Sequence, residues 1–228
     1  MNVTGIANLY RSLQANAAAP VDPVQKGLER ATARLEAQRQ TNQVQLSAYG
    51  QVKSGLSRIE DAGKTLTASG TVSPADTKKA LQSLVSAYNE TRTAAASTDP
   101  GYASNAANSL RRGVSTSSMR SDLASLGITQ KGDGSLSIDT KKLDQALAAN
   151  PIAVKEAASR VGGQLQESAT KSLSENGGIN RTLNALGSRA QQIGIQQTSI
   201  QSLTTTQTSS SGTNSSTGID SYLRIFSM

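Results

Sequence analysis

The carboxylates near the middle of the chain are the residues whose type and spacing could support chemistry. Asp139 and Asp144 lie close in sequence, and two carboxylates can act as general acid and base. Asp139, however, directly precedes a predicted helix, where its carboxylate serves better as an N-cap. The 228 residues include no His and no Cys, which excludes Ser/His/Asp triads, thiolate nucleophiles and disulfides. We therefore predict that the protein is not an enzyme and has no catalytic, cofactor-binding or metal-binding residues.

The Gly132-Asp133-Gly134 segment resembles an ion-binding or phosphate-binding loop only superficially. An EF-hand needs a series of Asp or Asn ligands ending in Glu, and a P-loop needs Gly-Lys-Ser/Thr. Neither pattern is present. Alternating polarity on both sides of this segment, between Gly127 and Ile138, instead predicts a β-hairpin with a glycine turn.

The net charge of +7 raises the possibility of nucleic-acid binding. Seven Lys or Arg residues lie between Lys26 and Lys64, but four acidic residues are interspersed among them. No aromatic stacking platform accompanies them. We interpret this as a solvated helix face and predict no nucleic-acid partner. A basic coiled-coil binder would instead lose affinity steeply with salt.

A seven-residue hydrophobic period predicts one long helix between Pro23 and the residues before Pro74. One seam position is occupied by Val24, Ala31, Gln38, Gln45, Val52, Ile59 and Leu66. The other is occupied by Leu28, Leu35, Asn42, Tyr49, Leu56 and Gly63. The polar centre of the seam costs stability but can specify register and partner.

A second heptad run predicts a C-terminal helix that pairs with the first. Its positions are Ile179, Leu186, Ile193 and Ile200, and Leu183, Ala190, Gln197 and Thr204. Neither helix can cover its hydrophobic stripe alone, so we expect an antiparallel pair within one chain. The predicted fold is mainly α: an elongated antiparallel coiled coil with a small α+β head that contains the hairpin.

The residues between the two heptad runs predict short elements. A helical face around Tyr88 is followed by a break at Pro100-Gly101 and a helical stretch from about Tyr102 to Leu126. After the hairpin, Asp139 caps a helix over 140–149, and Asn150-Pro151 ends it and opens another.

These signals predict five regions. They are a disordered export or assembly segment at 1–22, a coiled-coil helix at 23–69, a head at 75–160, coiled-coil helices at 161–204, and a flexible tail at 205–228. Of the residues from Thr204 to Gly218, 11 of 15 are Ser or Thr. The tail ends in an apolar cluster that is either a frayed end or a partner anchor: Tyr222, Leu223, Ile225 and Phe226.

Glycines within the long helices have two possible explanations, tolerated weakness or close helix approach. We favour tolerated weakness at Gly50. At Gly63, which occupies a seam position, we favour close packing. No apolar run reaches the roughly 20 residues that a membrane helix needs, and no cleavable secretory signal is visible.

The central motif SDLASLGITQKGDGSLSIDTKKLDQALAANPIAVKEA (121–157) resembles the flagellar filament-capping protein family, hook-associated protein 2 (FliD). SAYNETR (86–92) and NGGINRTLNALGSRAQQI (176–193) resemble the helix that opens the C-terminal half of that family and the start of its last coil. IANLYRSLQANAAAPV (6–21) and the heptads from Leu35 resemble its N-terminal segment and first coil. The family usually carries large outer domains before the Tyr-Asn helix, whereas only 67–79 lies there, so the chain resembles a reduced form. Its uncharged last coil also departs from the family pattern.

The resemblance implies a structural, non-enzymatic protein of the bacterial flagellum that functions in cell motility. It implies type III export without a cleavable signal, an extracellular location, and homo-oligomers at the filament tip that assist flagellin assembly or the hook–filament junction. The expected partners are further copies of the chain, flagellin, junction proteins and an export chaperone. An alternative is an intracellular or secreted adaptor or regulator that binds an export chaperone or flagellar axial proteins. The predicted coiled-coil and assembly residues are Val24, Leu28, Leu35, Asn42, Tyr49, Val52, Leu56, Ile59, Leu66, Ile179, Leu183, Leu186, Ile193 and Ile200.

Overall fold

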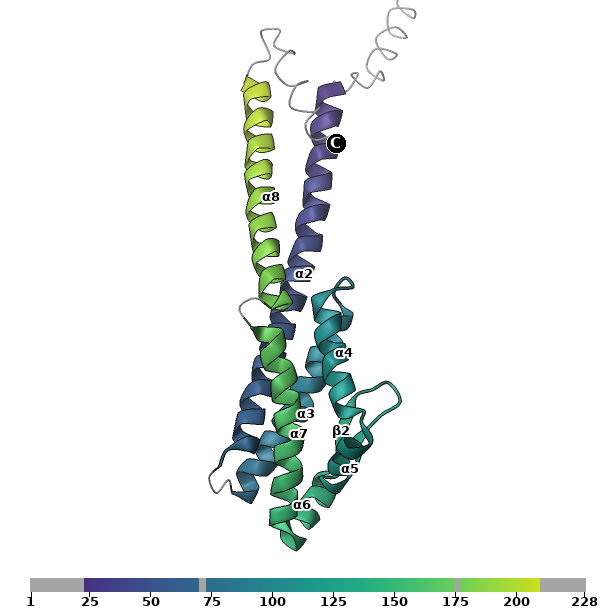
Figure 1. Cartoon of the computed structure of the whole chain (residues 1–228). Coiled ribbons are helices and arrows are strands. Elements are labelled where there is room, and N and C mark those ends of the chain that lie inside the picture. Colours follow the sequence, from purple (N-terminus) through teal and green to yellow (C-terminus); the bar gives the residue numbers. More distant parts are fainter. Residues whose placement is uncertain (1–22, 70–72, 175–176, 210–228) are drawn as a thin grey trace, which may run out of the picture. The chain divides into compact units, whose positions relative to one another are not determined.

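A computed structural model describes residues 23–69, 73–174 and 177–209, and helices dominate this part of the chain (Figure 1). The elements are α2 (Pro23–Thr67), α3 (Pro74–Ala96), α4 (Tyr102–Val114), α5 (Ser117–Ser125), β1 (Ile128–Gln130), β2 (Leu136–Ile138), α6 (Thr140–Ala149), α7 (Pro151–Leu173) and α8 (Gly178–Ser209). The prediction of a mainly α fold with a small α+β head is confirmed. Because α2 ends at Thr67 and α3 begins at Pro74, no large domain is inserted between them.

The chain divides into two compact units. The described part of the first unit contains α2 up to Gln40 and α8 from Gln191 onward. Here the two helices run side by side in opposite directions (Figure 1). Leu28, Leu35 and Ile200 form its small hydrophobic cluster. Gln197 Nε2 also donates a hydrogen bond to Glu36 Oε2 at 3.4 Å.

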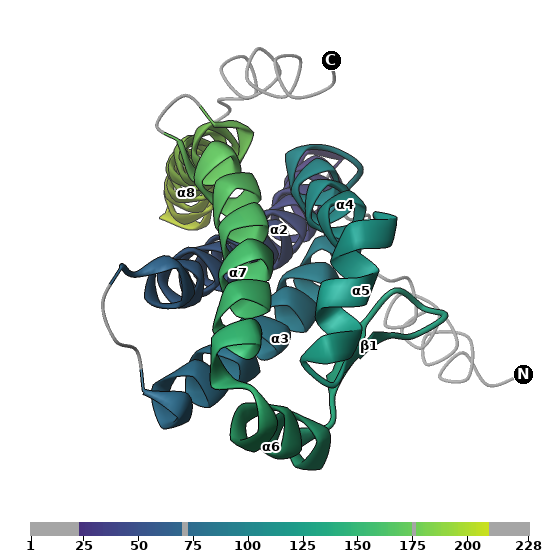
Figure 2. The ribbon, with the colours of Figure 1, turned by 60° about the horizontal axis from the view of Figure 1, so that its bottom comes forward.

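The second unit, Thr41–Ala190, holds the main hydrophobic core. Helix α7 contacts α3, α4, α5 and α6, and Figure 2 shows it in front of α3 with α4 and α5 beside it. The large side chains that are fully buried are Tyr88, Leu56, Ile59, Leu81, Leu84, Leu110, Leu123, Leu126, Ile128, Leu143, Leu165 and Ile179. Tyr88 is the one aromatic side chain among these, and Tyr49, which is 5% exposed, also belongs to this core.

Local capping explains where several helices begin. Asp139 Oδ1 accepts hydrogen bonds from the backbone N–H groups of Lys141 and Lys142, both at 3.1 Å, as predicted for an N-cap. Asn150 Oδ1 accepts from the backbone N–H of Ala153 at 3.1 Å, and a proline follows it at the first position of α7. The predicted boundary at Asn150 is thus confirmed.

The helical stretch predicted from Tyr102 to Leu126 is interrupted. The backbone leaves the helix at Ser115, and Thr116 is extended (φ −70°, ψ 153°) and caps α5 by accepting from the Met119 N–H at 3.4 Å. The prediction of one continuous stretch was wrong because hydroxyl side chains in this Ser/Thr-rich segment offer the backbone an alternative to helical hydrogen bonds.

The hairpin forms where the glycine turn predicted it. Strands β1 and β2 are antiparallel, with Ile128 opposite Ile138 and Gln130 opposite Leu136. Gly134 has a φ of +82°, a backbone conformation that glycine adopts without steric cost. No helix among the described residues is long and apolar enough to span a membrane.

Candidate functional site

Side chains of helix α3 form hydrogen bonds with backbone groups of β2 and of the hairpin turn. Asn89 Nδ2 donates to the Leu136 carbonyl at 2.8 Å, and its Oδ1 accepts from the Leu136 N–H at 2.9 Å. Tyr88 Oη donates to the Gly134 carbonyl at 3.2 Å, and Arg92 Nη2 donates to the Asp133 carbonyl at 2.5 Å. The Asn89 amide therefore pairs with β2 as a neighbouring strand would.

Charges around the hairpin turn are engaged in local hydrogen bonds. The backbone N–H and side chain of Ser135 donate to the Asp133 carboxylate, and these bonds lower the pKa of Asp133. Burial raises the pKa of Tyr88, so its hydroxyl stays protonated and can donate to the turn. The turn is thus a structural element held by α3.

The two carboxylates considered for acid/base chemistry serve separate structural purposes. Asp139 caps α6, whereas Asp144 accepts from Lys78 Nζ at 2.6 Å. Within 23–69, 73–174 and 177–209, no group of three or more His, Cys, Asp or Glu residues could hold a metal ion. Both carboxylates therefore contribute to local structure.

Most residues predicted for the coiled-coil interface are buried within their own chain. In the first unit these are Leu28, Leu35, Ile193 and Ile200, and in the second Asn42, Tyr49, Val52, Leu56, Ile59, Leu66 and Ile179. Leu183 and Leu186 are half-buried and pack against the core of the second unit. The side chain of Val24 and the apolar cluster Tyr222, Leu223, Ile225 and Phe226 lie outside the described residues. The buried members stabilise the subunit itself, so new contacts require other, exposed residues.

Helices α2 and α7 approach each other closely at a pair of glycines. A Cβ at Gly63 would lie 2.8 Å from the Gly162 carbonyl oxygen and 2.6 Å from Gln166 Cβ. A Cβ at Gly162 would lie 2.8 Å from Leu66 Cβ. The prediction of close packing at Gly63 is confirmed, and Gly50, with nothing within 4 Å, fits the prediction of tolerated weakness. Sequence reasoning missed Gly162, which adjoins Gly163 in a helical pattern.

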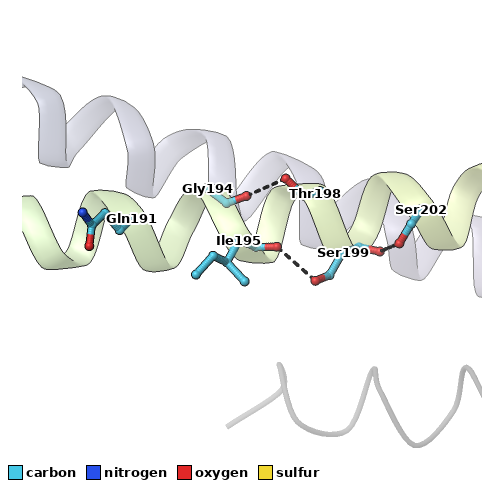
Figure 3. A pocket seen from close by; sticks show the side chains of 6 residues that line it. All are labelled: Gln191, Gly194, Ile195, Thr198, Ser199 and Ser202. Atoms are coloured by element: carbon cyan, nitrogen blue, oxygen red, sulfur yellow. Dashed lines mark hydrogen bonds between the residues drawn. The ribbon is translucent and has the colours of Figure 1, made fainter.

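The largest exposed apolar side chains among the described residues were not predicted. They are Val44, Tyr102, Ile152 and Ile195. Ile195 lies on the outward face of α8 in the first unit, where Gln191, Gly194, Thr198, Ser199 and Ser202 line a shallow hollow with it (Figure 3). The hydroxyls of Thr198 and Ser199 donate to the carbonyls of Gly194 and Ile195, both at 3.0 Å. These two hydroxyls therefore donate within α8, on a face that carries no charged residue.

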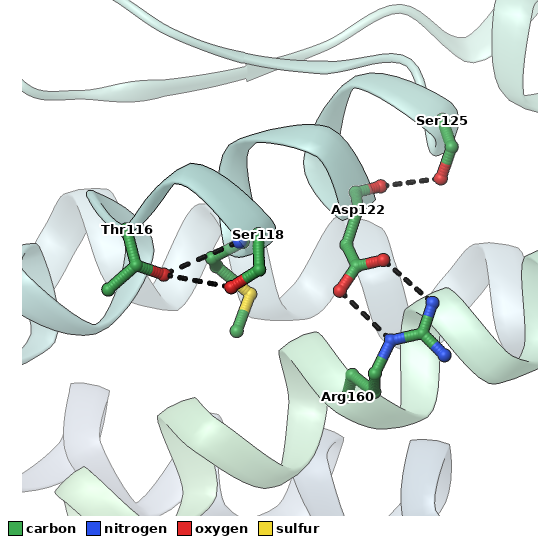
Figure 4. Close-up of polar contacts among 6 residues, drawn as sticks. Thr116, Ser118, Asp122, Ser125 and Arg160 are labelled. Carbon is green, nitrogen blue, oxygen red and sulfur yellow. Dashed lines mark hydrogen bonds and ion pairs between the residues drawn. The ribbon is translucent and has the colours of Figure 1, made fainter.

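An ion pair joins α5 to α7 in the second unit (Figure 4). Arg160 Nη2 and Nε donate to the two carboxylate oxygens of Asp122 at 2.7 and 3.0 Å. The hydrogen bond from Arg160 lowers the pKa of Asp122. This bidentate contact fixes the short helix α5 against the central helix.

Replacing Asp122 with Asn is expected to reduce the dependence of stability on acid pH. A carboxyl whose folded pKa is lowered stabilises the protein above its unfolded pKa of 3.8, and this stabilisation is lost as pH falls through the folded value. Urea unfolding between about pH 5 and about pH 2 should show the two chains converging at the acid end. Asp144→Asn is the control, because it removes the same charge from a more exposed side chain (53% exposed against 16% for Asp122) that pairs with Lys78 instead of Arg160. A constant gap across this range would contradict the prediction.

A second hollow in the second unit lies between α2 and α3. Ala62 and Ala80 contribute to it together with charged side chains of both signs, including Asp61 and Lys79. Arg58, which also lines it, forms an ion pair with Glu90 on α3. Charged side chains of both signs around two alanines do not indicate a particular type of ligand.

The described part of the chain is a helical bundle with one hairpin that α3 holds. A family model described as flagellar hook-associated protein 2 C-terminus matches residues 101–217, which is just over half of the chain. The chain therefore belongs to the hook-associated protein 2 (FliD) family, whose members are structural cap-related proteins of the flagellum. Comparisons with curated proteins and with solved structures find no match. The match begins at Gly101, so α2 and α3 precede it.

Proposed function

We propose that the chain oligomerises as a filament-cap-like protein that assists flagellin assembly or the hook–filament junction. The observation that supports this most strongly is the family match, which spans the hairpin and α4 to α8 up to its C-terminal end. Such work is steric, because a cap must present fixed surfaces to incoming subunits rather than react with them. A core built around α7, with the hairpin tied to α3, suits that requirement.

The first unit is the proposed site of self-association. Few of its described side chains are buried aliphatic ones, and a pair of helices with so little packing is marginal in water. The exposed Ile195 lies on an uncharged stretch of α8, since no charged residue occurs between Arg189 and Asp220. A further copy of the chain could cover this face without burying a charge.

The remaining regions have proposed roles in export and docking. Residues 1–22 would act as the uncleaved export segment, and the head at 75–160 would face flagellin or junction proteins. The tail at 205–228, with the anchor at Tyr222, Leu223, Ile225 and Phe226, would bind a partner, either an axial protein or an export chaperone. The protein would then work outside the cell on the flagellum.

Analytical ultracentrifugation of the purified chain, with electron microscopy of its complexes with flagellin, tests the proposed function. Oligomers that bind filament ends or hook–filament junctions are the expected result. A strictly monomeric chain with no affinity for flagellin or junction proteins would rule the proposal out. If residues 1–30 fused to a reporter are not exported and the chain binds an export chaperone, the intracellular adaptor is the correct function.

Ile195→Asp is expected to weaken self-association at least about tenfold, because it would bury an unpaired carboxylate in the contact. Sedimentation equilibrium measures the change. Asn184→Asp is the matched control: it adds the same charge to an exposed position of α8 in the second unit. Equal weakening by both variants would show that net charge, not the Ile195 face, controls association.

A further inference from the structure

Helix α8 has two different faces in the first unit. One face carries Ile193 and Ile200, which are buried, and Ile200 packs against Leu28 and Leu35 of α2. The other, the Ile195 face, points outward, and Ile195 is 68% exposed (Figure 3). The rest of the Ile195 face is small or polar but uncharged: Gln191, Gly194, Thr198, Ser199 and Ser202. One exposed isoleucine is common on protein surfaces, so it does not by itself indicate a binding face.

The last residues of the chain have the apolar spacing of a short amphipathic helix. Residues 219–226 lie outside the described part of the chain. In the sequence their apolar side chains recur at positions i, i+3, i+4 and i+7: Ile219, Tyr222, Leu223 and Phe226. Asp220 and Arg224 fall outside this apolar stripe, and an acid four residues before a base favours a helix. So short a helix is not stable alone in water and forms only against a surface.

The segment between α8 and this pattern has the composition of a flexible linker. Helix α8 ends at Ser209, and the nine residues 210–218 are all Gly, Ser, Thr or Asn. A linker of this length and composition has an end-to-end distance of about 15 to 18 Å as a coil. Fully extended, it reaches about 30 Å. The tail can therefore return along the helix to which it is attached.

The Ile195 face lies at the distance that this linker favours. In a tail that runs antiparallel to α8, Ile219 lies opposite Ser202. Phe226 then lies opposite Ile195, because both intervals are seven residues. The linker must span about 14 Å, given the helical rise from Ser202 to the end of α8 and the separation of two packed helices. Because span and linker length match, the effective concentration of the tail at this face is on the order of millimolar.

The N-terminal residues have a similar apolar spacing and are a second candidate occupant. Their apolar positions within 6–13 are Ile6, Leu9, Tyr10 and Leu13. They are joined to α2, however, whereas the Ile195 face points away from α2. The C-terminal tail is joined to α8 itself. Chain connectivity therefore favours the tail as the occupant of this face.

We propose that residues 219–226 dock as a short amphipathic helix on the Ile195 face of α8 in the same chain. The docked tail covers Ile195 with Phe226 and leaves Asp220 and Arg224 in water, so no charge is desolvated. Docking does not depend on the flagellar role. One consequence rests on the proposed self-association: the tail and a further copy of the chain compete for the same face. The tail therefore limits assembly until a partner binds the tail instead.

The fluorescence of a single tryptophan tests the docking, because the chain contains no native Trp. The indole introduced by Phe226→Trp should have a blue-shifted emission and be protected from acrylamide, relative to a peptide of residues 215–228 with the same substitution. Adding Ile195→Asp should lower the docking equilibrium constant at least about tenfold and move the emission toward that of the peptide. Asn184→Asp adds the same charge to an exposed position of α8 in the second unit and should change neither signal.

Substitutions in the tail test the same contact without altering α8. Leu223→Asp places a charge in the apolar stripe, so it should expose the indole even if Ile195→Asp disturbs the helix. Ser221→Asp adds the charge on the polar side of the tail and should leave the indole protected. An indole that is exposed in the otherwise unchanged chain would overturn the proposal, as would equal responses to these two substitutions.

Dilution identifies which chain supplies the tail. Protection of the indole that stays constant on dilution is expected for a tail docked on its own α8. Protection that disappears on dilution would mean that the tail docks on another copy, and it would overturn the proposal.

Sedimentation equilibrium separates failure of this inference from failure of the proposed function. Leu223→Asp should strengthen self-association because it uncovers the Ile195 face, whereas Ser221→Asp should not. A protected indole in a chain that stays monomeric even with Leu223→Asp would support the docking and contradict the proposed self-association. An exposed indole in a chain that self-associates would overturn the docking alone.

Discussion

Gly63→Ala is expected to lower the free energy of unfolding by about 1 to 3 kcal/mol. In an open helix the same change would be stabilising by up to about 1 kcal/mol, since Ala has the higher helix propensity. Here the new methyl group would lie 2.8 Å from the Gly162 carbonyl oxygen and 2.6 Å from Gln166 Cβ. Both contacts involve atoms near the α7 backbone, which cannot move aside without disturbing the core. Urea denaturation monitored by circular dichroism measures the effect.

Gly50→Ala is the matched control, because it is a Gly→Ala change in the same helix. A Cβ at Gly50 meets nothing within 4 Å. This variant should therefore gain stability, up to about 1 kcal/mol. The two substitutions should have opposite signs. If Gly63→Ala were also stabilising, the close approach of α2 and α7 would not be correct.

Asn89→Ala is expected to lower the free energy of unfolding by about 2 to 4 kcal/mol, because it leaves both backbone groups of Leu136 without their partner. Leu136 is 3% exposed, so water cannot readily replace the lost bonds. Hydrogen exchange should show a local effect as well: the Leu136 amide should exchange much faster, because its N–H donates to Asn89 Oδ1.

Two comparisons separate loss of this contact from general damage to α3. Gln82→Ala changes an exposed residue on the same helix and should leave stability nearly unchanged. Asn89→Asp retains an acceptor for the Leu136 N–H but loses the donor to its carbonyl, so it should fall between the other two variants. Equal stability of Asn89→Ala and Gln82→Ala would mean that α3 does not hold the hairpin through Asn89.

Local features of the fold could be predicted because their causes lie within a few residues. Asp139 caps the helix that it immediately precedes, and the glycine turn at Gly132–Gly134 joins two strands with the predicted alternation. Caps and turns are satisfied by neighbouring backbone groups, so they need no knowledge of the rest of the chain. The break at Thr116 shows the limit of this reasoning, since Ser and Thr are compatible with both a helix and a cap.

Periodicity predicted which face of α2 is buried but not everything that covers it. The heptads indicated the C-terminal helix as partner, and α8 does contact α2 in the first unit and at Asn42. Farther along α2, however, a Cβ at Gly55 would meet Thr91 of α3, and Gly63 faces α7. A hydrophobic stripe requires burial without specifying the partner. Several predicted assembly residues are consequently part of the subunit core.

The hydrogen bonds between α3 and the hairpin could not be predicted either, for a related reason. Tyr88 and Asn89 belong to the SAYNETR motif, which resembles the family, but nothing in the sequence linked them to Leu136 or Gly134. Their contacts join residues more than 40 positions apart in the chain. Such pairings depend on how α3 and the hairpin pack together, and the local preferences of residues for helix or strand do not determine this packing.

By itself, the sequence determined the helical fold class, the caps, the hairpin turn, the lack of His and Cys chemistry and a family resemblance. These follow from residue type, short-range hydrogen bonding and hydrophobic period. Only the tertiary structure decided that α3 holds the hairpin through Asn89, that Gly63 meets Gly162, and that the Asn42 amide donates to a backbone carbonyl of α8. Each of these depends on which surfaces are brought within a few ångströms, and that outcome is set by the packing of the whole unit.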